Sequence, residues 1–218
     1  MRVWIPGVPA TFATRGEKPW RTTIQAHLRS SFPAGTALYM QFVLPEADPW
    51  KRVADLDNFC EPVFYAIGKA SAWRRPMLRW WQAEKCFGAV PGLQITFLDA
   101  APDSQPTRSG PILFEGRYAG QLPASALDAE VPAWLGETWK RPALSSRERL
   151  GVELCFADSR VNIGDVSTGR VKSLVDCLFP VVGGSAGAPH DWKIDRLTVS
   201  KAAMSIGAGV EISIFRLC

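Results

Sequence analysis

Residues 37–68 read ALYMQFVLPEADPWKRVADLDNFCEPVFYAIG. The beginning of this stretch, Ala37–Leu44, predicts a strand, and an acidic break follows it. Four apolar residues then recur at i, i+4, i+5 and i+8, the spacing of one buried helical face: Phe59, Val63, Phe64 and Ile67. The stretch therefore predicts a strand and then a helix over Asn58–Gly68, with two aspartates where the helix begins.

The same folding unit extends to both sides of this stretch. A short strand over Arg2–Ile5 and a helix over Arg21–Arg29 are predicted before it, and strands near Arg79–Phe87 and Leu93–Leu98 after it. Residues 1–98 are therefore predicted to form a β-α-β-α-β-β unit, in which helices cover a sheet.

A linker and a second unit follow. Residues 99–110 (DAAPDSQPTRSG) are rich in Pro, Ser, Asp and Gly and lack an apolar period, which is typical of a linker. Residues 111–218 then show the same order of elements. Its predicted strands and helices are Pro111–Phe114, a short helix that begins near Trp134, Val152–Phe156, a helix over Gly169–Phe179, Lys193–Ser200 and Val210–Phe215.

Local matches support an internal duplication. Met40–Leu44 corresponds to Val152–Phe156, and Gly92–Thr96 corresponds to Gly209–Ser213. The apolar helical series of the first unit corresponds to Val171, Leu174, Val175 and Leu178. Chance similarity between two α+β halves is the alternative. We expect an α+β chain in which two repeats pack as a single-chain pseudo-dimer.

The composition restricts the class of protein. With 218 residues, 47% hydrophobic and 21% charged, the chain can bury a core, which excludes disorder. No apolar run approaches the roughly 20 residues of a membrane span, and no signal peptide is recognisable, so we expect a cytoplasmic protein without membrane contact. The five scattered cysteines include no CxxC pair, which argues against zinc. A net charge of +4 is compatible with nucleic acid.

The two aspartates are the densest chemical signal. In an extended Asp-x-Asp segment, Asp55 and Asp57 would lie on the same side, because successive side chains alternate. Two carboxylates so close repel each other unless a cation lies between them, and oxygen ligands suit Mg²⁺. The alternative is that Asp57 or Asn58 serves only as a helix N-cap.

The surroundings of this motif resemble the RusA family of Holliday-junction resolvases. The resemblance rests on PGVPATFATRGEKPW, a helix, a strand, basic residues, ADLDN and a second helix, and it covers nearly the whole chain, once per half. In that family DLDN opens a helix that carries a Lys and, one turn later, an Asp; a further Asp precedes the next strand. The resemblance implies Mg²⁺ bound by the acidic residues, and a dimeric enzyme that nicks four-way DNA junctions symmetrically.

The first half departs from the family pattern. Asp55, Asp57 and Asn58 match, but Glu61 and Tyr65 stand where the family has its Lys and helical Asp. An expected acidic pair is also replaced, by the basic sequence Arg74-Arg75-Pro76.

The second half departs in a complementary way. Lys172, Asp176 and Asp191 match, but Ser167 and Thr168 replace the Asp and Asn of the motif. The remaining aspartate, Asp165, fits only if one residue is inserted. Neither half holds a complete site.

Three interpretations follow. In the first, Asp55 and Asp57 of one half meet Lys172 and Asp191 of the other in a composite site. In the second, a degenerate site holds Asp165, Asp191 and Lys172 alone. In the third, catalysis is lost and the DNA-binding shape remains.

The favoured hypothesis is a Mg²⁺-dependent endonuclease that acts on branched or structured DNA. Asp55, Asp57 and Asp191 would be metal ligands, and Lys172 would stabilise the leaving oxygen. We expect a monomeric pseudo-dimer or a dimer of it, and one site per chain predicts a single nick unless the chain dimerises. The rivals are a catalytically inactive DNA-binding or assembly protein and a protein-binding subunit of a larger complex.

Short clusters of basic residues are candidates for phosphate contact. They are Arg15, Lys18, Arg21, Lys51, Arg52, Arg74 and Arg75. The alternative for each cluster is an ordinary solvated surface.

Overall fold

Alternating apolar residues place eight strands in one mixed sheet. The computed structural model describes residues 1–28, 37–46, 48, 53–70, 78–101, 110–145, 147–166, 169–202 and 207–217. The strands of the sheet are β1 (Arg2–Pro6), β2 (Ala37–Pro45), β3 (Trp80–Gly88), β4 (Gly92–Leu98), β5 (Ile112–Tyr118), β6 (Leu150–Phe156), β9 (Ile194–Lys201) and β10 (Val210–Arg216). The α+β class predicted from the sequence is confirmed.

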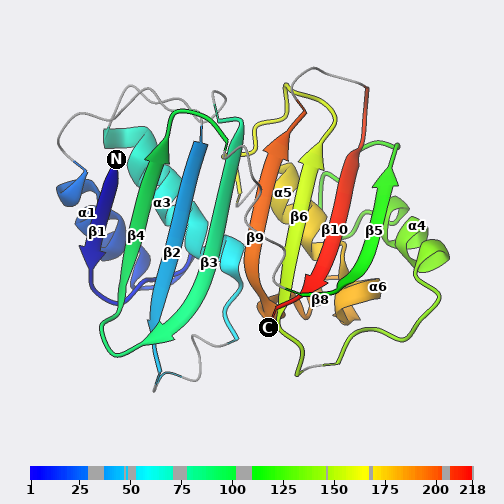
Figure 1. The fold of residues 1–218 in the computed structure, drawn as a ribbon, viewed down its shortest axis with the longest axis horizontal. Helices are drawn as coiled ribbons and strands as arrows, with labels where there is room; N and C mark the ends of the chain where they lie inside the picture. The colour runs from blue at the N-terminus through cyan, green and yellow to red at the C-terminus, as the bar shows by residue number, and fades with distance from the viewer. Residues whose placement is uncertain are drawn as a thin grey trace.

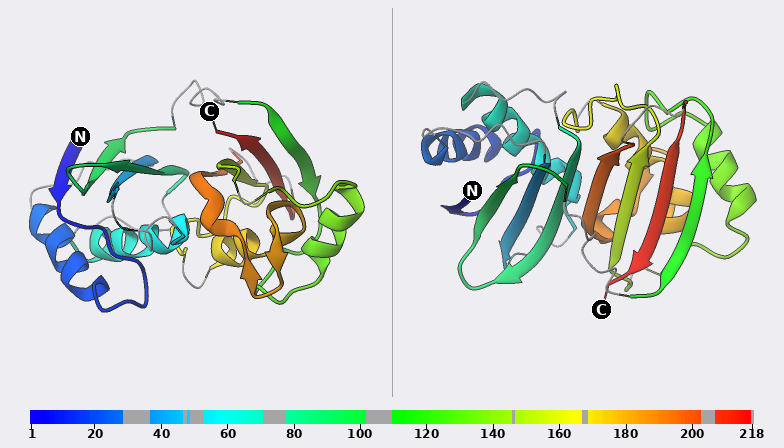
Figure 2. Two further views of the ribbon diagram at one scale, coloured as in Figure 1. Left: turned by 90° about the horizontal axis from the view of Figure 1, so that it is seen from below. Right: turned by 45° about the horizontal axis from the view of Figure 1, so that its top comes forward.

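The helices lie on one face of this sheet, as the two views of Figure 2 and the ribbon in Figure 1 show. They are α1 (Glu17–His27), α3 (Leu56–Ala70), α4 (Glu130–Thr138), α5 (Arg170–Asp176) and α6 (Phe179–Val182). A hairpin of β7 (Gly184–Ser185) and β8 (Ala188–Pro189) follows α6, and the short helix η2 (Asp191–Lys193) leads into β9. Each element predicted from the sequence therefore has a counterpart.

The strand order is β1-β4-β2-β3-β9-β6-β10-β5. From one edge inward, the strands of the first half are arranged in the order first, fourth, second, third (β1, β4, β2, β3). From the other edge inward, those of the second half have the same arrangement (β5, β10, β6, β9). The pairing senses agree as well, since β2–β3 and β6–β9 are parallel while β1–β4, β2–β4, β5–β10 and β6–β10 are antiparallel. The antiparallel pair β3–β9 joins the two sets into one sheet.

The core lies between the sheet and the helices. Phe42 of β2 and Phe59 of α3 are fully buried with ring centroids 5.5 Å apart. Trp81 of β3 packs edge-on against Phe64 at 5.5 Å, and its indole donates a hydrogen bond of 2.7 Å to the Ile163 carbonyl of the second half. Burial of each such side chain contributes roughly 1.5–3 kcal/mol, so these contacts hold α3 firmly on the sheet.

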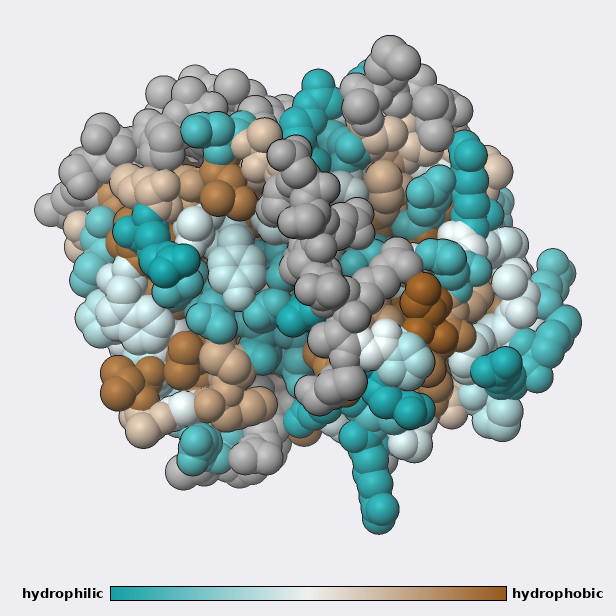
Figure 3. Space-filling model, viewed as in Figure 1, coloured by the Kyte–Doolittle hydropathy of each residue, from teal (hydrophilic) through white to brown (hydrophobic). Residues whose placement is uncertain are grey.

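Hydrophilic residues cover much of the other face of the sheet, the one that faces the viewer in Figure 3. A shallow hollow of about 370 Å³ on this face is lined by polar side chains of four strands, among them Glu115, Glu153, Thr198 and Glu211. Some polar side chains of this face are nevertheless buried, among them Gln82, Thr198 and Ser213, and the catalytic candidates lie on the other side of the sheet.

Proline residues explain two features of the helices. Pro62 lies inside α3 and has no N–H to offer the Asn58 carbonyl, which instead accepts the Phe12 N–H at 2.9 Å. The segment before α1 is thereby attached to the helix that carries Asp57. The single helix predicted over Gly169–Phe179 is wrong, because α5 ends at Asp176 and α6 begins at Phe179. Pro180 cannot donate to the Asp176 carbonyl.

The predicted linker, residues 99–110, falls mainly outside the described residues. In the part of the chain that the structure describes, no helix is long and apolar enough to cross a membrane.

Candidate metal centre

Asp55 and Asp57 lie at the start of α3. The predicted extended Asp-x-Asp segment is wrong, because α3 begins at Leu56 and Asp57 lies in its first turn. The Asn58 N–H donates to Asp57 Oδ1 at 2.9 Å, and Asn58 Nδ2 donates to Asp55 Oδ2 at 2.9 Å. Asn58 therefore fixes both carboxylates by hydrogen bonds.

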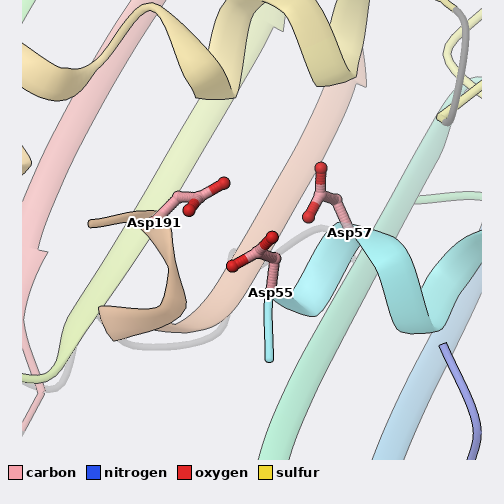
Figure 4. A group of neighbouring side chains, drawn as sticks. All are labelled: Asp55, Asp57 and Asp191. Carbon is pink, nitrogen blue, oxygen red and sulfur yellow. The ribbon is translucent and has the colours of Figure 1, made fainter. Parts of the chain in front are cut away.

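Asp191 comes from the other half of the chain. It begins η2, immediately before β9, and is 3% exposed. Its carboxylate points toward those of Asp55 and Asp57, as Figure 4 shows, and one oxygen from each of the three lies within 4.8 Å of the others. Residues separated by more than 130 positions in the sequence thus form one acidic triad.

Lys172 of α5 places its ammonium beside the triad. Its Nζ lies 3.1 Å from Asp57 Oδ2, 3.3 Å from Asp191 Oδ2 and 3.9 Å from Asp55 Oδ2. A fourth carboxylate, that of Asp176 one turn later, lies 2.8 Å from the same nitrogen. When all four carboxylates are ionised, one ammonium leaves a surplus of three negative charges.

Burial and the neighbouring charges together shift the pKa of three groups of the cluster. Burial, reinforced by Asp55, raises the pKa of Asp57, and Lys172 only partly opposes it. Burial and the charges of Asp55 and Asp57 raise the pKa of Asp191 to about 8, again against Lys172. Burial alone would lower the pKa of Lys172, but Asp57, Asp191 and Asp176 together raise it. The cluster thus holds Lys172 charged and has room for further positive charge.

One oxygen of the cluster lacks a hydrogen bond. Asp57 Oδ2 is buried and has no hydrogen-bond partner, although Lys172 Nζ lies 3.1 Å away as an ion pair. This contact is an ion pair, because a short N–O distance without suitable angles is not a hydrogen bond. A buried carboxylate oxygen without a donor is an unusual and costly feature, and a bound cation would satisfy it.

The structure brings together four residues that the sequence singled out, Asp55, Asp57, Lys172 and Asp191. Asp165 does not belong to this group. It lines a separate hollow of about 520 Å³ with Asp158, Arg160 and Arg170. The geometry therefore corresponds to the composite arrangement and not to a site built from Asp165, Asp191 and Lys172 alone.

The predicted basic residues are only partly described. Arg15 and Lys18 are exposed near the start of α1. Arg21 forms an ion pair with Glu17, and its guanidinium lies 3.8 Å from the centre of the Tyr65 ring, so its charge is engaged within the protein. The other predicted basic residues, Lys51, Arg52, Arg74 and Arg75, lie outside the described residues.

Sequence reasoning missed two residues near the site. Asp176 matched the family pattern but was not assigned to the site, although it makes the shortest contact with Lys172. Lys85 on β3 was not considered, and its Nζ donates hydrogen bonds to both acid-bearing segments. A signal was present, since Trp81, Ala83, Lys85 and Phe87 alternate along one face of a strand and the lysine interrupts an apolar pattern.

Comparison of the chain with protein-family models, with curated proteins and with solved structures finds no match.

Proposed function

We propose that the protein is a divalent-cation-dependent endonuclease that acts on branched or structured DNA. The observation that carries the proposal is the convergence of Asp55, Asp57 and Asp191 from two halves of the chain beside the ammonium of Lys172. Bringing three carboxylates together, two of them buried, is unfavourable without added positive charge, so the arrangement favours a cation site over a structural role.

The donor set fits a hard cation. All the candidate ligand atoms are carboxylate oxygens, which Mg²⁺ and Ca²⁺ prefer. Oxygen ligands on opposite sides of Mg²⁺ are about 4.2 Å apart, and those around Ca²⁺ are up to about 5.2 Å apart. Oxygens within 4.8 Å of one another thus need only small side-chain movements to bind Mg²⁺.

The residues of the site have distinct roles in this proposal. Asp55, Asp57 and Asp191 would hold the cation, and Asn58 orients two of them by hydrogen bonds. Such an ion, when bound, activates water for attack on a phosphodiester and neutralises developing negative charge. Lys172, kept protonated by its acidic neighbours, can donate a hydrogen bond to the leaving oxygen.

The strand registers support an origin by duplication. We take Gly92–Thr96 as equivalent to Gly209–Ser213, so Thr96 is equivalent to Ser213. Thr96 pairs with Tyr39, which pairs with Gln82. In the second half, Ser213 pairs with Glu153, which pairs with Thr198. Gln82 and Thr198 then pair with each other across β3 and β9, and Thr198 Oγ1 donates to Gln82 Oε1 at 3.2 Å. Equivalent residues meet in this way only at an approximate two-fold axis, as in a symmetric dimer.

The same registers correct one predicted match. Met40 pairs with Ile95, and the equivalent Ile212 pairs with Leu154. Met40 is therefore equivalent to Leu154, two residues beyond the predicted Val152. The two RusA-like repeats of our proposal remain, with this match shifted by two residues.

The choice of DNA as substrate rests on the RusA resemblance and on basic residues. Arg15 and Lys18 are exposed, and the chain has a net charge of +4. With one composite site, the protein would cut one strand in each event, unlike a symmetric resolvase.

One observation favours a second candidate, a catalytically inactive DNA-binding or assembly protein on the same scaffold. Lys172 lies within 4 Å of four carboxylates, so it partly neutralises the cluster without any cation. In this alternative the cluster connects the two halves, and no chemistry follows.

A cleavage assay separates these two functions. Four-way, flap and linear DNA are incubated with the protein and Mg²⁺, with Asp57→Asn as the test variant and Asp158→Asn, an aspartate away from the triad, as the matched control. We expect the native protein and Asp158→Asn to nick branched DNA and Asp57→Asn to leave it intact. Intact DNA with every protein, together with a gel shift that survives Asp57→Asn, would favour the inactive binding protein.

A further inference from the structure

Lys85 of β3 is a buried lysine at the junction of the two halves. Its side chain has no exposed surface. Burial lowers the pKa of Lys85, and the carboxylate of Asp195 on the neighbouring strand β9 opposes that shift. Removing an ammonium from water is costly, so a lysine here requires strong compensating contacts.

Those contacts reach both segments of the acidic triad. Lys85 Nζ donates to the Ala54 carbonyl at 3.0 Å and to the Trp192 carbonyl at 2.8 Å, and it lies 3.3 Å from Asp195 Oδ1. Two of the three hydrogens of the ammonium are thus donated to backbone carbonyls, and Asp195 balances its charge as an ion-pair partner. Ala54 immediately precedes Asp55, and Trp192 immediately follows Asp191.

Arg149 also connects Asp195 to Trp192, which follows Asp191 in the chain. Asp195 Oδ2 lies 3.5 Å from Arg149 Nε, and the Arg149 guanidinium lies 5.8 Å from the centre of the Trp192 ring. Trp192 is therefore held through its carbonyl by Lys85 and through its ring by Arg149. Both contacts restrict the position of Asp191, its neighbour in the chain.

We propose that Lys85 is a positioning residue, which connects the Ala54–Asp57 segment to the Asp191–Lys193 segment by hydrogen bonds. It thereby sets the distance between the carboxylates supplied by the two halves. Lys85 acts through hydrogen bonds to the backbone carbonyls beside the triad carboxylates. The effect on metal affinity rests on the proposed function, whereas the effect on the two segments does not.

The test compares two buried lysines. Lys85→Met keeps the length of the side chain and removes the donors. Lys201→Met is the matched control, because Lys201 is a buried lysine of β9 whose charged neighbours are Arg79 and Asp158. A second variant, Lys85→Met combined with Asp195→Asn, removes the carboxylate left without its ammonium and serves if the single variant does not fold.

The first readout is hydrogen exchange of the metal-free protein. It is measured by mass spectrometry on peptides that cover residues 53–60 and 190–196. We expect both peptides to exchange about 10-fold faster in Lys85→Met and at the native rate in Lys201→Met. Native exchange in both peptides of Lys85→Met would overturn the proposal.

Mn²⁺ affinity measured by calorimetry is the second readout. Loss of groups that orient metal ligands typically weakens binding about 10- to 100-fold, and we expect a loss in this range for Lys85→Met alone. Equal affinity in native protein and Lys85→Met would overturn the positioning role. Faster exchange of both peptides in a protein that binds no Mn²⁺ would retain that role and contradict the proposed nuclease instead.

Discussion

The charge balance at Asp191 has a consequence for stability. Its pKa is raised from 3.8 to about 8 by burial and by Asp55 and Asp57. Between these values the folded protein retains a proton that the unfolded chain has lost, so the free energy of unfolding falls as pH rises from about 4 to 8. A cation that binds the ionised triad should restore stability at the upper end of this range.

We therefore expect Mg²⁺ to raise the melting temperature more at pH 8.5 than at pH 6. Differential scanning calorimetry at both pH values measures this difference. Asp191→Asn should flatten the pH dependence and remove the effect of Mg²⁺. An unchanged pH profile in Asp191→Asn would contradict the account of the triad.

Lys172 supplies the ammonium in direct contact with the triad. Removing one partner of a buried ion pair typically costs about 3–5 kcal/mol, because the other charge remains buried, and Lys172→Met leaves several such charges. We expect a loss of this size by urea unfolding at pH 8 without divalent cations. Arg160→Met is the control: Arg160 pairs with Asp158 at 2.9 Å but is 85% exposed, so little change is expected. Equal stability of the two variants would show that the cluster is not a buried charge network.

The residues of the candidate site were predictable in type more than in position. DLDN and the Lys172–Asp176 spacing indicated the chemistry, and the complementary departures of the two halves suggested a composite site. The sequence offered either Asp55 with Asp57 or Asp165 as the partners of Asp191, and only the fold separates these alternatives, because Asp191 comes close to α3 through the β3–β9 junction. Lys85 was missed because its role depends on carbonyls far away in sequence.

At the scale of elements, the apolar periods located the strands and helices well, whereas the breaks depended on backbone geometry. The strand over Ile112–Tyr118 is longer than predicted because Glu115, Gly116 and Arg117 lie on an edge strand, where few apolar residues are required. The split between α5 and α6 follows from Pro180, whose effect depends on which carbonyl it deprives of a donor.

Two glycines near the start of β10 test how closely this strand approaches β5. Gly209 has φ of +116°, and a Cβ there would lie 2.1 Å from the Tyr118 carbonyl oxygen. Gly207 has φ of +115° and nothing within 4 Å of such an atom. Alanine at either position pays the strain of positive φ, about 1–3 kcal/mol. Gly209→Ala should lose roughly 1–3 kcal/mol more, because overpacking adds to the strain.

Urea unfolding of the two variants measures this difference. Equal losses in Gly207→Ala and Gly209→Ala would mean that the start of β10 and the end of β5 do not approach as closely as described. The pairing of β10 with β5 would then need revision.

At the scale of the whole molecule, the identical order of the two sets of strands places one acidic triad at the junction of the halves. In the sequence, the acids of a second site would be expected within residues 71–77 and at residues 167 and 168, which lie outside the described residues. The sequence carries basic or hydroxyl residues there instead of acids. One site per chain should therefore make one incision per event.

A supercoiled plasmid that extrudes a cruciform distinguishes single from paired incisions. A single nick relaxes the plasmid to an open circle, which removes the cruciform, whereas paired incisions yield linear DNA directly. We expect the open circle to accumulate. Linear DNA formed without an open-circular intermediate would imply two coordinated sites, and thus a dimer of the chain.

The central claim is that carboxylates from both halves form a single cation site, and isothermal titration with Mn²⁺ tests it most directly. We predict one ion per native chain, with affinity reduced at least about 100-fold in both Asp57→Asn and Asp191→Asn, since each removes a ligand rather than an outer group. Asp165→Asn, outside the triad, should bind as the native protein does. Retention of the native affinity in either Asp57→Asn or Asp191→Asn would contradict the claim.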